Sequence, residues 1–230
     1  MFNPAYSPTQ VAELQRSFLN RVFLWMTAGL LVTAAVATGV ASSPAIINLV
    51  HGNPMIFFGL FIVQIAMVFG LSLGIGKLSP AVATAIFMLY AVINGVTLSG
   101  IVLAYTGESI ATTFFVTAGT FGAMAAYGYT TKRDLSGLGS IAVMALIGLL
   151  IASVVNIFLA NSTLYWILTY AGVLIFVALT AWDVQKLKRI GTQIQDETSA
   201  GRMAILGALT LYLDFINLFL YMLRILGRRN

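Results

Sequence analysis

Two aspartates within apolar stretches are the residues of this sequence best placed to do chemistry. Asp214 lies in the middle of ALTLYLDFINLFLYMLRIL, which runs from Ala208 to Leu226, and Asp183 ends the apolar block before it. An ionisable side chain inside a membrane costs about 3 kcal/mol or more and commonly marks a proton or ion path. We therefore predict that both carboxyl groups act on protons and cations.

Asp214 belongs to a polar stripe on an otherwise apolar helix. Polar residues recur there at intervals of three and four positions, which places them on one helical face. A polar face cannot lie against lipid, because its groups would lack hydrogen-bond partners. We expect this helix to be central, or to line a cavity, with the following residues on its inner face: Thr210, Asp214, Asn217, Tyr221 and Arg224.

A contact between the two aspartates would make the chemistry specific. Two carboxylates at short range in a low dielectric cannot both ionise easily, so the pair would share a proton near physiological pH. Without that proton the pair would repel itself and attract Ca²⁺, a hard cation that binds oxygen ligands. Protons and calcium would then compete at Asp183 and Asp214. Calcium would be a transported or transiently bound ion, and no cofactor is expected.

The residues alone leave a second interpretation open for each aspartate. Asp183 stands near the predicted membrane boundary and precedes Lys186, Lys188 and Arg189, with which it could form interfacial ion pairs. Asp214 could be a structural hub that accepts hydrogen bonds from neighbouring hydroxyls and amides. Spacing in the sequence does not decide whether residues on two different helices meet.

The composition indicates the environment of these carboxyl groups. Of the 230 residues, 60% are hydrophobic and 8% are charged, whereas soluble domains are near a quarter charged. A soluble protein of this length could not bury so much apolar surface. We predict one integral membrane domain over residues 1–230.

No cysteine is present, which excludes disulfides and thiolate metal sites. A basic, aromatic polar surface is also lacking, so nucleic acid is not an expected partner.

Seven apolar segments are long enough to span a bilayer, which needs about 20 residues. We predict a polar N-terminal tail over residues 1–21 and a polar loop over residues 184–203, between the sixth and seventh spans. The predicted spans are Val22–Ser42, Met55–Ile75, Val82–Tyr105, Ile110–Thr130, Gly139–Ala160, Leu164–Asp183 and Ala204–Leu226.

Lysine and arginine alternate between the connections and predict the orientation. They occur in the N-terminal tail and after the second, fourth and sixth spans, but not after the first, third and fifth. The positive-inside rule therefore places the N-terminus and the 184–203 loop in the cytoplasm. The basic C-terminus, RILGRRN, does not fit this rule, because seven crossings would place it outside the cytoplasm. We favour seven crossings over a last segment that returns to the cytoplasm. Without an organelle-targeting segment, we expect a bacterial inner membrane.

Other polar and small residues within the spans are interpreted as packing features. Gln64, Asn94 and Asn156 are expected to form hydrogen bonds between helices. His51 is expected to be solvated in a short loop. A face of small residues in the fourth span is expected to pack closely against another helix: Ala118, Gly122 and Ala126.

The segment ALTLYLDFINLFLYMLRIL resembles the C-terminal signature of the transmembrane Bax-inhibitor-motif family. YTTKRDLSGLG (Tyr129–Gly139) and GVTLSGI in the third span also resemble that family, and the likeness extends over residues 20–226. The resemblance implies seven helices with the last surrounded by the other six, and a pH-sensitive calcium leak. It also implies that an aspartate ending the sixth helix and one within the seventh, here Asp183 and Asp214, form a hydrogen-bonded pair that senses protons.

The sequence departs from the family at two positions. Some relatives carry an acid near the position of Gln64, and some carry an arginine after the second helix that holds the aspartate pair. Here the nearest base in that stretch, LSLGIGKLSP, is Lys77. Bacterial relatives are also linked to membrane-embedded proteases, so a regulator that binds another membrane protein without transporting ions is the alternative function.

Enzyme activity is not expected. An intramembrane aspartyl protease needs Gly-x-Gly-Asp before one aspartate, and here LTLYL precedes Asp214. A rhomboid-type protease needs a Ser–His pair within the membrane, and the only histidine is the loop residue His51. The last span has no lysine that could bind retinal.

Overall fold

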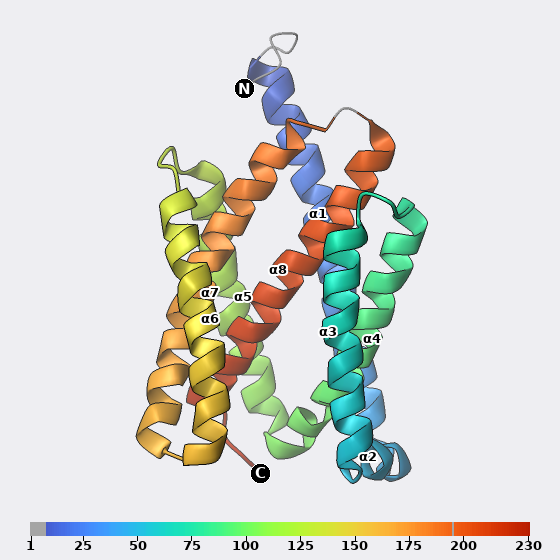
Figure 1. Cartoon of the computed structure of the whole chain (residues 1–230), viewed down its shortest axis with the longest axis vertical. Helices are drawn as coiled ribbons and strands as arrows, with labels where there is room; N and C mark the ends of the chain where they lie inside the picture. The colour runs from blue at the N-terminus through green and yellow to red at the C-terminus, as the bar shows by residue number, and fades with distance from the viewer. Residues whose placement is uncertain (1–7, 195) are drawn as a thin grey trace. The chain divides into compact units, whose positions relative to one another are not determined.

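The computed structural model describes residues 8–194 and 196–230, which form eight α-helices (Figure 1). Seven of these helices, all but α2, are long and apolar enough to cross a membrane. The prediction of an all-α protein with seven spans is therefore confirmed. The helices are α1 (Pro8–Ala41), α2 (Pro44–His51), α3 (Pro54–Gly74), α4 (Pro80–Ala104), α5 (Gly107–Thr130), α6 (Ser136–Leu159), α7 (Ser162–Gly191) and α8 (Glu197–Leu226).

Proline and capping residues fix where several helices begin. Proline occupies the first turn of α2, α3 and α4, where its missing N–H costs no helical hydrogen bond. The Asn53 side chain accepts hydrogen bonds from the N–H groups of Met55 and Ile56 at the start of α3. Ser79 does the same for Val82 at the start of α4. These signals explain why the predicted spans agree with the helices in the middle of the chain.

The predicted connection between the last two spans is wrong in length. Residues 184–203 were expected to form a polar loop, but α7 continues to Gly191 and α8 begins at Glu197, which leaves only residues 192–196 between them. Lysine and arginine are good helix formers, so the charges end the apolar segment without ending the helix. The predicted tail is also largely helical, because α1 begins at Pro8; residues 1–7 of that tail, and residue 195 of the predicted loop, lie outside the described residues.

His51 is not a solvated loop residue. It ends α2, a short helix that the sequence analysis did not predict, and its Nε2 lies 3.0 Å from the hydroxyl of Ser99 in α4. Its ring also contacts Phe57 in α3, with 5.5 Å between ring centroids. The histidine therefore helps to hold α2 against its neighbours.

The chain divides into two compact units, which are described separately. The first unit contains α1 to α4, the chain from Lys188 to Tyr212, and Arg229–Asn230. Within it α1 packs along α4, α3 also contacts α4, and α2 contacts all three. Gly95 of α4 permits the close approach to α1, because a Cβ there would lie 2.7 Å from the carbonyl oxygen of Thr33. The contact thus depends on the absence of a side chain.

A buried hydrogen-bond network joins α1, α4 and the first half of α8 in this unit. Thr33 donates to the carbonyl of Ala91 (2.9 Å), so the hydroxyl of Tyr212 donates to Thr33 at 2.6 Å and accepts from the amide of Asn94 at 2.8 Å. Gln64 of α3 likewise donates to Thr97 at 3.1 Å. The predicted interhelical roles of Asn94 and Gln64 are confirmed.

Asn156, by contrast, does not join two helices. Its side-chain oxygen accepts from the N–H of Asn161, just beyond the end of α6. Ala160 there has a left-handed backbone with φ 47°, a conformation that is uncommon for residues other than glycine. Asn156 therefore stabilises a tight turn, and the prediction of an interhelical bond is wrong.

Tyr212→Phe is expected to lower the free energy of unfolding by about 1–2 kcal/mol, because it leaves buried Asn94 and Thr33 without the hydroxyl they share. Thermal melting of the purified protein in detergent would measure this loss. Tyr221→Phe is the matched control on the same helix, since no hydrogen bond is formed by the Tyr221 hydroxyl within the described residues. Equal melting temperatures for the two variants would contradict the role of the network.

The ends of α8 show that this helix traverses the full length of α4. Near its start, Arg202 donates to the carbonyl of Gly76, in the turn that precedes α4. Beyond its end, the backbone N–H of Asn230 donates to the carbonyl of Ala104, at the last residue of α4. The two ends of the last segment therefore contact opposite ends of α4, as the favoured seven-crossing prediction requires, while the membrane side of the C-terminus stays a prediction.

The second unit contains α5, α6, the chain of α7 up to Leu187, and the chain from Leu213 to Arg228. Phe215 of α8 packs edge-on against Phe114 and Phe121 of α5 at 5.5 Å. Tyr221 of α8 stacks on Phe176 of α7 at 6.0 Å. The last helix is the most enclosed of the seven spans. Of its most apolar segment 61% is buried, against 11% for the corresponding segments of α3 and α6. Its central position is thus confirmed.

The face of small residues predicted to pack in α5 is the wrong one. Gly122 and Ala126 are exposed, and a Cβ at Gly122 would meet no atom within 4 Å in the described part of the chain. The close contact is made instead at Gly128, where a Cβ would overlap the carbonyl oxygen of Ala181 in α7. Small residues occur on more than one face of α5, so spacing alone could not select between them.

Candidate functional site

The two predicted aspartates meet inside the second unit. Asp183 lies within α7 and Asp214 within α8, and their carboxyl groups share a hydrogen bond. Both side chains are buried, with 6% and 5% of their surfaces exposed. Asp183 is therefore not an exposed carboxylate, although its position relative to the membrane boundary stays a prediction. Lys186 still acts on it electrostatically, while the Lys186 ammonium lies over the ring of Trp182, 5.0 Å from the centroid.

Close contacts from α5 and α6 fix the segment of α7 that carries Asp183. Gly128 of α5 lies against the backbone of Ala181, and Gly139 of α6 lies against the ring of Trp182; a Cβ at either glycine would overlap its neighbour. Both glycines touch residues immediately before the aspartate. The carboxyl group is therefore positioned by backbone and ring contacts on two sides of α7.

Gln185 ties the same segment to the connection between α5 and α6. Its side-chain oxygen accepts from the N–H of Leu135 at 2.9 Å, and its amide donates to the carbonyl of Arg133 at 2.8 Å. Gln185 is itself 6% exposed. Gln185 and both glycines were not predicted from the sequence. A signal that could have indicated them is the YTTKRDLSGLG motif, which contains Gly139 itself and the two partners of Gln185, Arg133 and Leu135.

Packing on the other side holds the segment of α8 that carries Asp214. Phe215, the next residue, packs against two phenylalanines of α5. The hydroxyl of Thr117, also in α5, contacts the sulfur of Met222 in α8 at 3.4 Å. Asp214 therefore approaches α7 from a helix that has little freedom to rotate. The geometry of the pair follows from the packing of four helices, α5 to α8.

The hydrogen bond constrains the protonation of the pair. An ionised carboxylate can only accept hydrogen bonds, so a bond between two carboxyl groups needs a proton on one of them. The second oxygen of Asp214, Oδ2, has no hydrogen-bond partner among the described residues, although it is fully buried. A buried oxygen without a hydrogen-bond partner costs free energy, so binding of a water molecule or a cation to this oxygen would be favourable.

The other residues of the predicted stripe do not join the pair. Thr210 and Asn217 donate to carbonyls of their own helix, those of Leu206 and Leu213. Arg224 is exposed, and its guanidinium lies over the Tyr221 ring at 5.0 Å. The stripe thus supplies one buried ionisable group, Asp214. Lys77, the base considered for a latch, lies exposed in the turn after α3.

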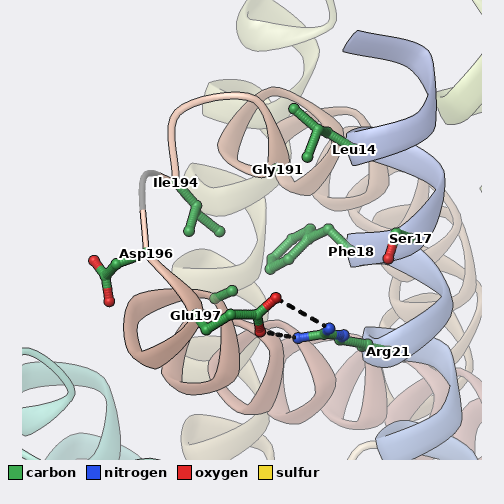
Figure 2. A pocket seen from close by; sticks show the side chains of 9 residues that line it. Leu14, Ser17, Phe18, Arg21, Gly191, Ile194, Asp196 and Glu197 are labelled. Carbon is green, nitrogen blue, oxygen red and sulfur yellow. Dashed lines mark hydrogen bonds and ion pairs between the residues drawn. The ribbon is translucent and has the colours of Figure 1, made fainter. Parts of the chain in front are cut away.

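A separate cavity of about 200 Å³ lies in the first unit, between α1 and the connection that joins α7 to α8 (Figure 2). Leu14, Phe18 and Ile194 form its apolar part, and Arg21 and Glu197 form an ion pair of 2.8 Å at its edge (Figure 2). These two side chains are 47% and 82% exposed, so the pair contributes little to stability.

Asp196, beside this cavity, is committed to capping α8. Its carboxylate accepts from the N–H of Ser199 at 2.8 Å, and these hydrogen bonds lower the pKa of Asp196. The charged groups of the cavity are thus satisfied by one another or by the helix end. The buried aspartate pair is the stronger candidate site.

These features define a class: a multi-pass helical membrane protein with a hydrogen-bonded pair of carboxyl groups buried between its last two helices. The family model described as inhibitor of apoptosis-promoting Bax1 (Bax1-I) matches residues 15–230. The chain belongs to this family, as the resemblance in the sequence indicated.

Curated bacterial proteins are similar over nearly the whole chain. The inner membrane protein YbhL of Escherichia coli K12 is 54% identical over 217 residues, which cover 94% of this chain and 93% of that protein. A protein of Borreliella burgdorferi is 44% identical, with 94% of each chain covered. A protein of Rickettsia prowazekii is 41% identical over 94% of this chain and 91% of its own length.

Proposed function

We propose that this protein is a pH-sensitive calcium leak channel that is gated by protonation of Asp183 and Asp214. The observation that carries the proposal is the hydrogen bond between two carboxyl groups that are almost fully buried in membrane-spanning helices. A proton holds such a pair together, and its loss leaves two like charges at short range. Repulsion between them would then favour separation of α7 and α8 near the pair.

Calcium is the cation that suits this chemistry. The deprotonated pair offers up to four carboxylate oxygens, and Ca²⁺ accepts six to eight oxygen ligands with flexible geometry. Within the described residues no group of three or more His, Cys, Asp or Glu side chains could hold a metal ion. Water and backbone carbonyls would therefore complete the shell. A weak, incomplete site of this kind suits an ion that passes through.

We place the protein in a bacterial inner membrane, with its N-terminus in the cytoplasm. The location is supported by the Escherichia coli relative, which is named as an inner membrane protein, and by the seven long apolar helices. The orientation rests on the lysines and arginines of the alternate connections.

Calcium flux into dye-loaded proteoliposomes, measured from pH 5 to pH 8, tests the proposal. We expect flux to rise with pH, because protons leave the pair as pH rises and the free carboxylates then bind calcium. Empty liposomes and heat-denatured protein are the controls. A folded protein without flux at any pH would contradict the channel and would favour the alternative, a regulator that binds another membrane protein.

A further inference from the structure

Arg224 lies on an aromatic platform at the end of α8. It is in the last turn of the helix and exposed, and its guanidinium carbon is 5.0 Å from the ring centroid of Tyr221 and 5.6 Å from that of Tyr165 in α7. A guanidinium held over aromatic faces by cation–π attraction spends none of its N–H donors on hydrogen bonds to those rings. The platform therefore holds the charge in place without consuming its donors.

The platform itself is rigid. The Tyr221 ring stacks on Phe176 with an interplanar angle of 27°. It also lies against Gly172, where a Cβ would come within 2.6 Å of the ring. Tyr165 contacts Trp166 edge-on at 5.7 Å. The position of the guanidinium is thus determined by two helices and does not depend on the flexible stem of Arg224 alone.

No carboxylate of residues 8–194 or 196–230 pairs with Arg224. The contacts of its guanidinium in that part of the chain are the two aromatic rings. A guanidinium has five N–H donors in a fork that matches the oxygens of a phosphate or carboxylate. A guanidinium without a carboxylate partner is able to bind an anion from outside the chain.

The surroundings place this group at the level of lipid headgroups. Trp166 and Tyr170 stack on each other at 6.0 Å near the start of α7 and are 42% and 54% exposed. Exposed tryptophan and tyrosine at the ends of membrane helices occupy the interface between hydrocarbon and water. Arg224 is two residues from the end of its own helix. Its donors therefore face the region where phospholipid phosphates lie.

We propose that Arg224, held on the Tyr165–Tyr221 platform, binds the phosphate of an anionic phospholipid. A zwitterionic headgroup would bring an ammonium group, and no acidic side chain of the described residues contacts Arg224 to receive it. Arg228, four residues further along, adds a second positive charge. This lipid site is independent of the proposed calcium leak and gives Arg224 a role other than the predicted supporting polar face.

Native mass spectrometry of the full chain in detergent tests the proposal, with phosphatidylglycerol and phosphatidylcholine as probes that differ in mass. Arg224→Gln is expected to weaken binding of the first phosphatidylglycerol by more than about fivefold, because fivefold is the factor that one basic residue contributes near an anionic membrane surface without a specific site. Phosphatidylcholine binding should not change. Tyr165→Leu keeps the charge but removes half of the platform, and should also weaken phosphatidylglycerol binding.

Arg228→Gln is the matched control, because it removes the same charge four residues further along the chain, beyond the end of α8, and leaves Arg224 on the two platform rings. It should change phosphatidylglycerol binding less than Arg224→Gln does. Equal losses of phosphatidylglycerol binding in the two variants would overturn the site, because binding would then depend on overall positive charge and not on Arg224. Wild-type protein without a preference for phosphatidylglycerol would overturn it as well. Displacement of the lipid by millimolar inorganic phosphate would show a site for a soluble anion instead.

Discussion

Asp214→Asn is expected to abolish the pH dependence of calcium flux and to lower the flux at pH 8 by about tenfold or more. Two unit charges 4 Å apart interact by about 4 kcal/mol at an effective dielectric of 20, so removing one carboxylate weakens the attraction for calcium by more than a factor of ten. The asparagine amide can donate to Asp183, which keeps the two side chains together without a shared proton.

Asp183→Asn should have the same effect, and the double variant should add little, because both residues act through one shared proton. Glu197→Gln is the matched control, since it removes an acid from the start of α8 that lies outside the buried pair. Flux is measured in proteoliposomes from pH 5 to pH 8, and size-exclusion profiles verify folding. A wild-type pH profile in both folded asparagine variants would rule out the pair as the sensor.

Gly128→Ala is expected to lower the free energy of unfolding by about 1–3 kcal/mol, the usual cost of adding atoms to a packed interior. The new methyl group would overlap the carbonyl oxygen of Ala181, so α5 and α7 would have to separate. Backbone atoms cannot move aside as a flexible side chain can. Thermal melting in detergent measures the change.

Gly122→Ala is the control on the same helix. Nothing in the described residues lies within 4 Å of the methyl group that it adds, and alanine is the better helix former. Its melting temperature should equal or slightly exceed that of the wild type. A similar loss in both variants would show that the effect comes from α5 as a helix and not from its contact with α7.

The spans could be predicted because the length of an apolar segment is a local property of the sequence. The segment from Val82 to Tyr105, for example, matches α4 closely, since Ser79 and Pro80 mark its start. The ends of the basic segments could not be predicted in this way. Hydropathy reports where the membrane ends, whereas α7 continues as a helix through Lys186, Lys188 and Arg189. The short helix α2 gave too few residues for a periodic pattern.

The candidate site was predicted in its residues but not in its contacts. Costly carboxyl groups in apolar segments identify Asp183 and Asp214, yet their meeting depends on how the four helices α5 to α8 pack. The role of Gln185 is equally a tertiary property, since its partners Leu135 and Arg133 are far away in the chain. The polar stripe predicted more site residues than the structure brings together, because the side chains of Thr210 and Asn217 donate to carbonyls of their own helix.

The short connection between α7 and α8 also bears on biosynthesis. Only residues 192–196 separate the two helices, so they leave the ribosome in immediate succession, and we expect them to enter the translocon as a helical hairpin. An aspartate at the centre of a lone helix raises the free energy of insertion through the translocon by about 3 kcal/mol. In a hairpin, Asp183 and Asp214 can find each other before either is exposed to lipid. The translocon would then release α7 and α8 together, with the carboxyl pair already formed.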